Sequence, residues 1–109
     1  MEAGAVQQQT LIVPHAETLI SASKLAIQED KPIKLDFYVE SMQCRCRLVK
    51  NQQKENLLFK SDDEYTSPIR KLFQIDSSQT SDGHKDIICV TENSIYIINN
   101  RILQQQQAS

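Results

Sequence analysis

Two apolar runs near the C-terminal end of the chain constrain its fold most. The runs are Ile87–Val90 and Ile95–Ile98, and only the polar segment Thr91–Ser94 separates them. Continuous apolar runs joined by a short polar turn are typical of two antiparallel strands that are buried on both faces. We therefore expect this hairpin at the centre of a sheet or barrel, with Asn99-Asn100 at its end.

An amphipathic helix is predicted near the N-terminal side. Pro14 suits the first turn of a helix, and Glu17 complements the positive N-terminal end of the helix dipole. One stripe of apolar and small residues then recurs at three- and four-residue intervals: Ala16, Leu19, Ile20, Ser23, Ala26 and Ile27. Pro32 ends the pattern because proline disfavours a helical residue before it and donates no backbone hydrogen bond. The expected helix covers roughly residues 15–29.

A half-buried strand is predicted to follow the helix, because the hydrophobic period changes to two. One face carries Ile33, Leu35, Phe37 and Val39, and the other carries Lys34, Asp36, Tyr38 and Glu40. After a break at Ser41–Gln43, a second alternation sets Cys44, Cys46 and Leu48 against Arg45, Arg47 and Val49. These two segments are expected to form an antiparallel hairpin.

Two further strands are predicted before the central hairpin. Leu57–Phe59 follows a polar turn, and Ile69–Ile75 begins after Pro68, where a strand tolerates proline. Ser77–Lys85 is expected to be a loop. The predicted fold class is α+β, with one N-terminal amphipathic helix followed by five or six antiparallel strands. The helix either packs on an open meander or covers one mouth of a small SH3-like or pleckstrin-like barrel.

Length and composition favour a single domain. The chain has 109 residues, of which 39% are hydrophobic and 24% charged, so it can bury enough apolar surface to fold unaided. We assign residues 1–13 to an N-terminal arm, 14–103 to one α+β domain, and 104–109 to a disordered tail rich in glutamine. No fixed-period repeat or long linker suggests a second domain.

Charge and targeting signals place the chain inside the cell. The formal net charge of −2 gives no global attraction to nucleic acid or to an anionic membrane. The longest apolar runs are far shorter than the roughly 18 residues of a membrane span, and the N-terminus does not resemble a secretory signal. We expect an intracellular, cytoplasmic protein without membrane contact. Its three cysteines are expected to be reduced thiols.

Residues that could carry chemistry do not form a recognisable site. Cys44 and Cys46 suggest a metal or redox pair, but their possible companions Cys89, His15 and His84 have no zinc-ligand spacing. We interpret the thiols as core residues. The acidic loop Asp62–Glu64 lacks EF-hand spacing, and neither histidine is linked to a nucleophile. No catalytic residue, metal site or cofactor is therefore predicted.

One binding face and one modification site follow from the sequence. In the expected first hairpin, Lys34, Tyr38, Arg45 and Arg47 share the outer face, where Asp36 and Glu40 can also pair with the arginines. Ser67 precedes Pro68 in a segment that resembles a proline-directed kinase site and is a candidate phosphosite. The alternative is a strand start that no kinase modifies.

These observations favour a non-catalytic interaction or structural module that works through protein–protein contacts within a larger assembly. A protein partner or a homo-oligomer is expected, reached through an edge strand or the basic hairpin face. The alternative is a small nucleic-acid-binding β-barrel that uses Lys34, Tyr38, Arg45 and Arg47. An unrecognised hydrolase or redox enzyme ranks third.

Overall fold

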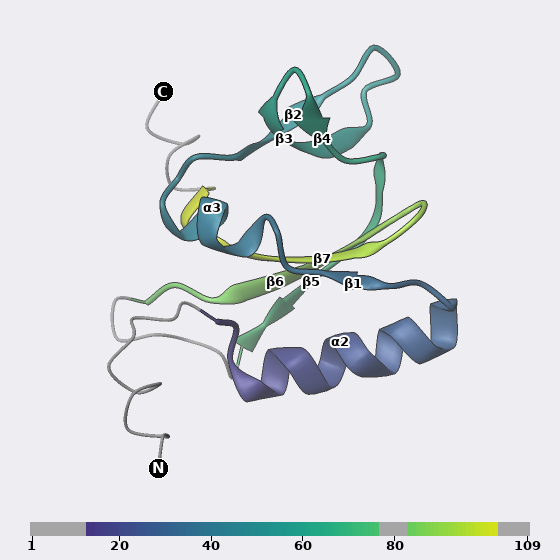
Figure 1. Cartoon of the computed structure of the whole chain (residues 1–109), viewed down its shortest axis with the longest axis vertical. Helices are drawn as coiled ribbons and strands as arrows, with labels where there is room; N and C mark the ends of the chain where they lie inside the picture. The colour runs from purple at the N-terminus through teal and green to yellow at the C-terminus, as the bar shows by residue number, and fades with distance from the viewer. Residues whose placement is uncertain (1–12, 77–82, 103–109) are drawn as a thin grey trace.

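The computed structural model of the protein describes residues 13–76 and 83–102, and it confirms the α+β class (Figure 1). The described residues form seven strands in two sheets. The central sheet has the order β1-β7-β6-β5, and the outer sheet has the order β2-β3-β4. In the described part of the chain neither sheet closes into a barrel. The glutamine-rich tail, residues 77–82 of the predicted loop and all but the last residue of the predicted arm lie outside the described residues.

The predicted C-terminal hairpin is confirmed as the middle of the central sheet. Strands β6 (Asp86–Thr91) and β7 (Ile95–Asn99) pair antiparallel, and all of β6 is buried. Two hydrogen bonds between Thr91 and Ser94 stabilise the turn that joins these strands. The backbone N–H of Ser94 donates to the hydroxyl of Thr91 at 3.0 Å, and the backbone N–H of Thr91 donates to the carbonyl of Ser94 at 2.8 Å. The apolar runs thus form the two strands with neighbours on both sides.

The edges of the central sheet come from distant parts of the chain. Strand β5 (Ile69–Ile75) pairs antiparallel with β6 and confirms the strand predicted at these residues. The other edge is β1 (Ile33–Lys34), which runs parallel to β7. A single short parallel strand at one edge therefore completes a sheet that is otherwise antiparallel.

The strand predicted over residues 33–40 is wrong beyond Lys34. The chain instead forms the short helix α3 (Tyr38–Met42). Phe37 and Tyr38 are neighbours, yet both are buried, and they belong to two different core clusters. A half-buried strand exposes one of any two neighbours, so it could not bury both. The alternation over residues 33–40 therefore does not mark a half-buried strand, and Leu35 on its apolar face is 46% exposed.

The outer sheet replaces the predicted first hairpin. Strand β2 (Arg47–Lys50) pairs antiparallel with β3 (Asn56–Ser61), and β3 pairs with β4 (Glu64–Tyr65). The third strand predicted around Leu57–Phe59 is therefore confirmed. The partner predicted for the segment containing β2 was wrong, because the polar turn after Lys50 makes β3 the local partner. The side chain of Asn51 stabilises this turn by accepting the backbone N–H groups of Gln53 and Glu55, each at 2.9 Å.

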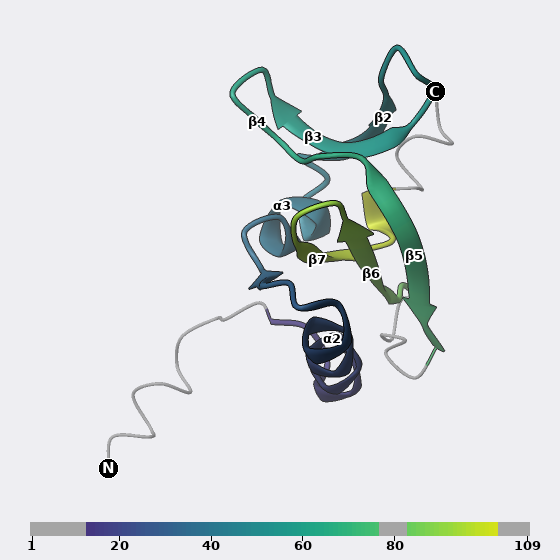
Figure 2. The ribbon, with the colours of Figure 1, turned by 90° about the vertical axis from the view of Figure 1, so that its right-hand side faces the viewer.

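Three layers result (Figures 1 and 2). Helix α2 (Ala16–Glu29) lies on one face of the central sheet, and the outer sheet and α3 lie on the other. The outer layer encloses a core of Phe37, Cys46, Leu58, Ile87, Cys89, Ile98 and Ile102. The helical layer encloses a second core of Ala22, Tyr38, Ile88, Val90, Ile95 and Ile97. No described helix is long and apolar enough to cross a membrane.

Helix α2 has the predicted extent but a different buried face. Thr18 and Ala22 are fully buried, whereas Ile20 is 50% and Ile27 83% exposed. The stripe that includes Ile20 and Ile27 is therefore only partly turned to the core. The hydroxyl of Thr18 donates to the buried carboxylate of Asp86 at 2.8 Å, which fixes the rotation of the helix about its axis. The hydrogen bond between Thr18 and Asp86, rather than the apolar stripe, thus decides which face of α2 is buried.

Candidate functional site

The predicted basic face is not assembled. Lys34 lies in β1, Tyr38 begins α3, Arg45 precedes β2 and Arg47 lies within it. Tyr38 is only 3% exposed, so it cannot offer a ring at the surface. Only Arg45 and Arg47 lie together, where they line one pocket. The face depended on a hairpin between residues 33–40 and 44–49, and that hairpin does not form.

Ser67 lies between β4 and β5 and is half-buried. Its carbonyl accepts a 2.8 Å hydrogen bond from the hydroxyl of Thr66, whose backbone N–H donates to the carbonyl of Leu58. Phosphorylation of Ser67 stays a prediction of the sequence.

Cys46 and Cys89 belong to the core of the outer layer, as predicted, whereas Cys44 lies outside that cluster. All three thiols are free. Cys46 and Cys89 are buried, and burial raises the pKa of each thiol to about 12, so both are protonated at neutral pH. Cys44 is half-buried and adopts a positive φ of 57° in the turn after α3. Within residues 13–76 and 83–102, no group of three histidine, cysteine or acidic side chains is placed to hold a metal ion.

A buried carboxylate that sequence reasoning missed joins four elements. Asp86, at the start of β6, is fully buried. Among the described residues, its carboxylate accepts hydrogen bonds from the His15 backbone N–H at 3.0 Å, the Thr18 hydroxyl at 2.8 Å, the Tyr38 phenol at 2.7 Å and the Asn99 amide at 3.3 Å. Burial, and then the bond to Asp86, raise the pKa of Tyr38. Because the carboxylate is enclosed by its own chain, it positions the elements around it.

Strand β5 leaves one edge of the central sheet open. Within the described residues it pairs with β6 alone, and five consecutive residues, 70–74, are exposed. Leu72 is 46% and Phe73 40% exposed, although neighbouring side chains of a strand point to opposite faces. Both faces of this strand therefore present an apolar side chain to solvent. Figure 2 shows β5 running along one side of the molecule.

The two cations of β5 are held by carboxylates of the same chain. Arg70 contacts Glu55 at 2.9 Å and Glu92 at 3.0 Å, and Lys71 contacts Glu29 at 2.9 Å. Hydrogen bonds from Asn51, and then from Arg70, lower the pKa of Glu55. The positive charge on this edge is therefore balanced locally.

A groove of about 370 Å³ runs between α2 and β5. Its walls are formed by Ser21, Lys24, Leu25, Gln28, Phe73, Gln74, Ile75 and Ile88. The helix side is mainly polar and the sheet side mainly apolar. Lys24 forms no ion pair with any described residue. We call this groove and the open side of β5 the β5 edge.

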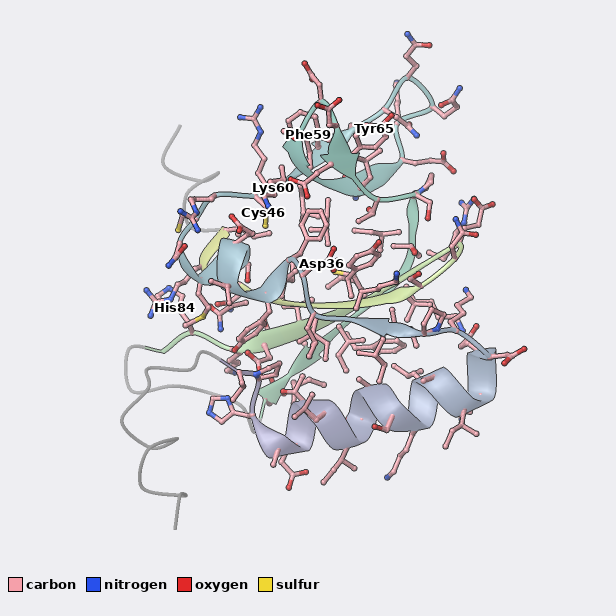
Figure 3. The ribbon with its side chains drawn as sticks, in the orientation of Figure 1. Asp36, Cys46, Phe59, Lys60, Tyr65 and His84 are labelled. Atoms are coloured by element: carbon pink, nitrogen blue, oxygen red, sulfur yellow. The ribbon has the colours of Figure 1, made fainter. Side chains whose placement is uncertain are left out.

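The outer sheet carries a second surface, which we call the Arg47 row. Arg47, Phe59 and Tyr65 are cross-strand neighbours on β2, β3 and β4. The Arg47 guanidinium lies 5.7 Å from the centre of the Phe59 ring, and the rings of Phe59 and Tyr65 are 6.4 Å apart with an interplanar angle of 15°. Figure 3 shows the two rings side by side on the outer sheet.

A pocket of about 220 Å³ opens beside this row. It is lined by Cys44, Arg45, Cys46, Arg47, Phe59 and Lys60. Glu40 contacts Arg45 at 3.1 Å and Lys60 at 3.5 Å. A hydrogen bond to Glu64 is the main cause that raises the pKa of Lys60. Figure 3 places Cys46 and Lys60 between the outer sheet and α3.

No protein-family model, curated protein or solved structure matches this chain. We therefore infer function from two of the surfaces that the described residues form, the β5 edge and the Arg47 row. Sequence reasoning missed both, although each left a signal. The adjacent apolar pair Leu72-Phe73 within a short strand marks the first. Phe59 and Tyr65, on either side of the polar turn Asp62-Asp63, mark the second as a cross-strand aromatic pair.

Proposed function

We propose that this protein is a non-catalytic interaction module that adds an extended strand of a protein partner to β5. One observation carries the proposal: in the described part of the chain this seven-residue strand is hydrogen-bonded on one side only, and Leu72 and Phe73 are exposed beside its open edge. An open edge presents a row of backbone N–H and C=O groups that a partner strand can pair with.

The charges of β5 support this use of the edge. Exposed edge strands are often protected from pairing by charged side chains. Here Arg70 and Lys71 contact glutamate oxygens of neighbouring elements at 2.9 to 3.0 Å. An incoming strand therefore meets neutralised cations, and the apolar pair Leu72-Phe73 lies at the middle of the contact.

The groove beside the edge supports a preference for certain segments. Alternate side chains of an added strand point to the α2 side of the central sheet. There they would meet the apolar sheet wall formed by Phe73, Ile75 and Ile88. Lys24, on the helix wall, has no carboxylate partner among the described residues. The segment that fits best is extended, apolar at alternate positions, and acidic where it passes Lys24.

Peptide display tests this proposal and does not require the natural partner to be identified. Short random peptides would be selected on the wild-type protein alone, and the affinity of each selected peptide would then be measured on the double variant Leu72→Lys, Phe73→Lys. We expect selected peptides with alternating apolar residues, whose affinity falls by about tenfold or more on Phe73→Lys, as for a central interface side chain. The control is Ile27→Lys, an apolar residue of α2 that is 83% exposed and does not line the groove, which should leave binding unchanged.

A second copy of the protein could also pair with β5, because it carries the same open edge. Sedimentation velocity of the wild-type protein tests for this self-association. Self-association that Phe73→Lys abolishes would assign the added strand to that second copy. Selected peptides that bind the double variant as tightly as the wild type would overturn the proposed function.

A further inference from the structure

The Arg47 row is built as a stack of planar groups. Arg47, Phe59 and Tyr65 occupy directly opposed positions on three neighbouring strands, so they project from the same face of the outer sheet. The two rings are nearly parallel, and the guanidinium lies over one of them. Tyr65, at the end of the row, is 60% exposed. Aromatic and guanidinium planes that reach solvent in this way are surfaces on which nucleic-acid bases stack.

The neighbouring pocket is suited to an anion. Three of its six lining residues are cations, Arg45, Arg47 and Lys60, and none is acidic. Arg47 forms no ion pair with any residue that the structure describes, and its guanidinium lies against the Phe59 ring. Glu40 holds Arg45 and Lys60 from the α3 side. The charge of Arg47 is therefore the one in this pocket that remains available to a phosphate.

A planar stack beside a cationic pocket matches the two parts of a nucleotide. From this juxtaposition we infer that the Arg47 row and its pocket bind single-stranded nucleic acid, with a base on the exposed ring of Tyr65 and a phosphate at Arg47. Phe59 lies between Tyr65 and Arg47 in the row, so it supports both groups and separates the base from the phosphate. A duplex hides its base faces and does not fit this surface. The site lies on the outer sheet and is separate from the β5 edge, so it goes beyond the proposed function.

The overall charge of −2 does not oppose this inference, because contacts with phosphate act over a short range in salt. We expect the affinity to be modest and to depend only weakly on salt concentration. Few phosphates are neutralised, since Arg45 and Lys60 already have carboxylate partners. The slope of log affinity against log salt should therefore correspond to about one or two phosphate contacts.

Fluorescence anisotropy with labelled single-stranded oligouridine and oligothymidine at low salt tests the inference. The wild-type protein should bind, and Tyr65→Ala and Arg47→Gln should each weaken binding by about tenfold. Tyr65→Phe keeps the stacking plane and should bind as the wild type does. Lys34→Gln, which removes an exposed cation of β1 in the central sheet, outside this row and its pocket, is the matched charge control and should have no effect.

Competition experiments show whether the site recognises a base together with a phosphate or a phosphate alone. Unlabelled uridine monophosphate should compete weakly, and inorganic phosphate should compete less well still, because it offers no base to stack. Loss of binding on Arg47→Gln together with no change on Tyr65→Ala would show an anion site without base stacking and would overturn the inference. Absence of oligonucleotide binding at low salt, or equal loss on Lys34→Gln, would overturn it as well.

Discussion

The phenol of Tyr38 donates a 2.7 Å hydrogen bond to the carboxylate of Asp86, and both side chains are buried. The bond joins α3 to β6. The same carboxylate receives the hydroxyl of Thr18 from α2 and the amide of Asn99 from β7. One acidic side chain therefore sets the positions of both helices relative to the central sheet, and through α2 it also shapes the groove beside β5.

Removal of the Tyr38 hydroxyl should destabilise the protein. In Tyr38→Phe the buried carboxylate of Asp86 loses the 2.7 Å hydrogen bond that the phenol donates. We expect the free energy of unfolding to fall by about 1–3 kcal/mol, measured by urea denaturation. Tyr65→Phe removes the same group from an exposed ring and should change stability by less than about 0.5 kcal/mol. Equal effects of the two substitutions would contradict the role of Asp86.

The rotation of α2 can be tested by two substitutions on opposite faces. Ala22 is fully buried against the central sheet, so Ala22→Leu should overpack this contact and cost about 1–3 kcal/mol in thermal or urea unfolding. Ile27 is 83% exposed, and Ile27→Lys should change stability by less than about 0.5 kcal/mol. If Ile27→Lys were the more damaging change, the apolar stripe would face the core after all.

The sequence predicted the elements whose patterns are local. The hairpin of β6 and β7, strand β5 and the extent of α2 follow from uninterrupted apolar runs and from proline positions. The buried face of α2 could not be predicted in the same way. It depends on the bond between Thr18 and Asp86, which are 68 positions apart in the chain.

The candidate sites were predicted less well, because they depend on which strands pair. A two-residue period over residues 33–40 indicated a strand, but burial of both Phe37 and Tyr38 requires a turn into α3. Without that strand, Arg47 pairs with Phe59 rather than with the predicted partner. The predicted basic face therefore does not form, and Arg47 lies beside two aromatic residues, Phe59 and Tyr65, instead.

Thiol labelling should distinguish the three cysteines of the native protein. Cys46 and Cys89 are buried and their pKa values are raised to about 12, so each is inaccessible and protonated at about pH 8. Cys44 is half-buried at a surface turn. We expect a charged disulfide reagent to modify Cys44 alone, and the other two only in urea, as read by mass spectrometry of the labelled peptides. Fast labelling of Cys89 in the native state would contradict its place in the core.

Stability should fall in alkaline solution. The folded pKa of Cys89 is about 12 against an ordinary value of 9.0, so above pH 9 the unfolded chain releases this proton while the folded chain retains it. Between these two pKa values Cys89 contributes a loss of about 1.4 kcal/mol per pH unit, and the raised pKa of Tyr38 acts in the same direction. Urea midpoints should be constant from about pH 7 to 9 and then decline. Cys89→Ala should make the decline less steep, and an unchanged slope would contradict burial of this thiol as its cause.

Amide hydrogen exchange with and without a selected peptide tests the open β5 edge most directly. In the free protein, the amides of β6 and β7 should be protected, and the outward-facing amides of β5 should exchange rapidly. Addition of the peptide should slow exchange in residues 69–75 and leave the outer sheet unchanged. Protection that appears in the outer sheet or in α2, while residues 69–75 exchange as before, would contradict strand addition to β5.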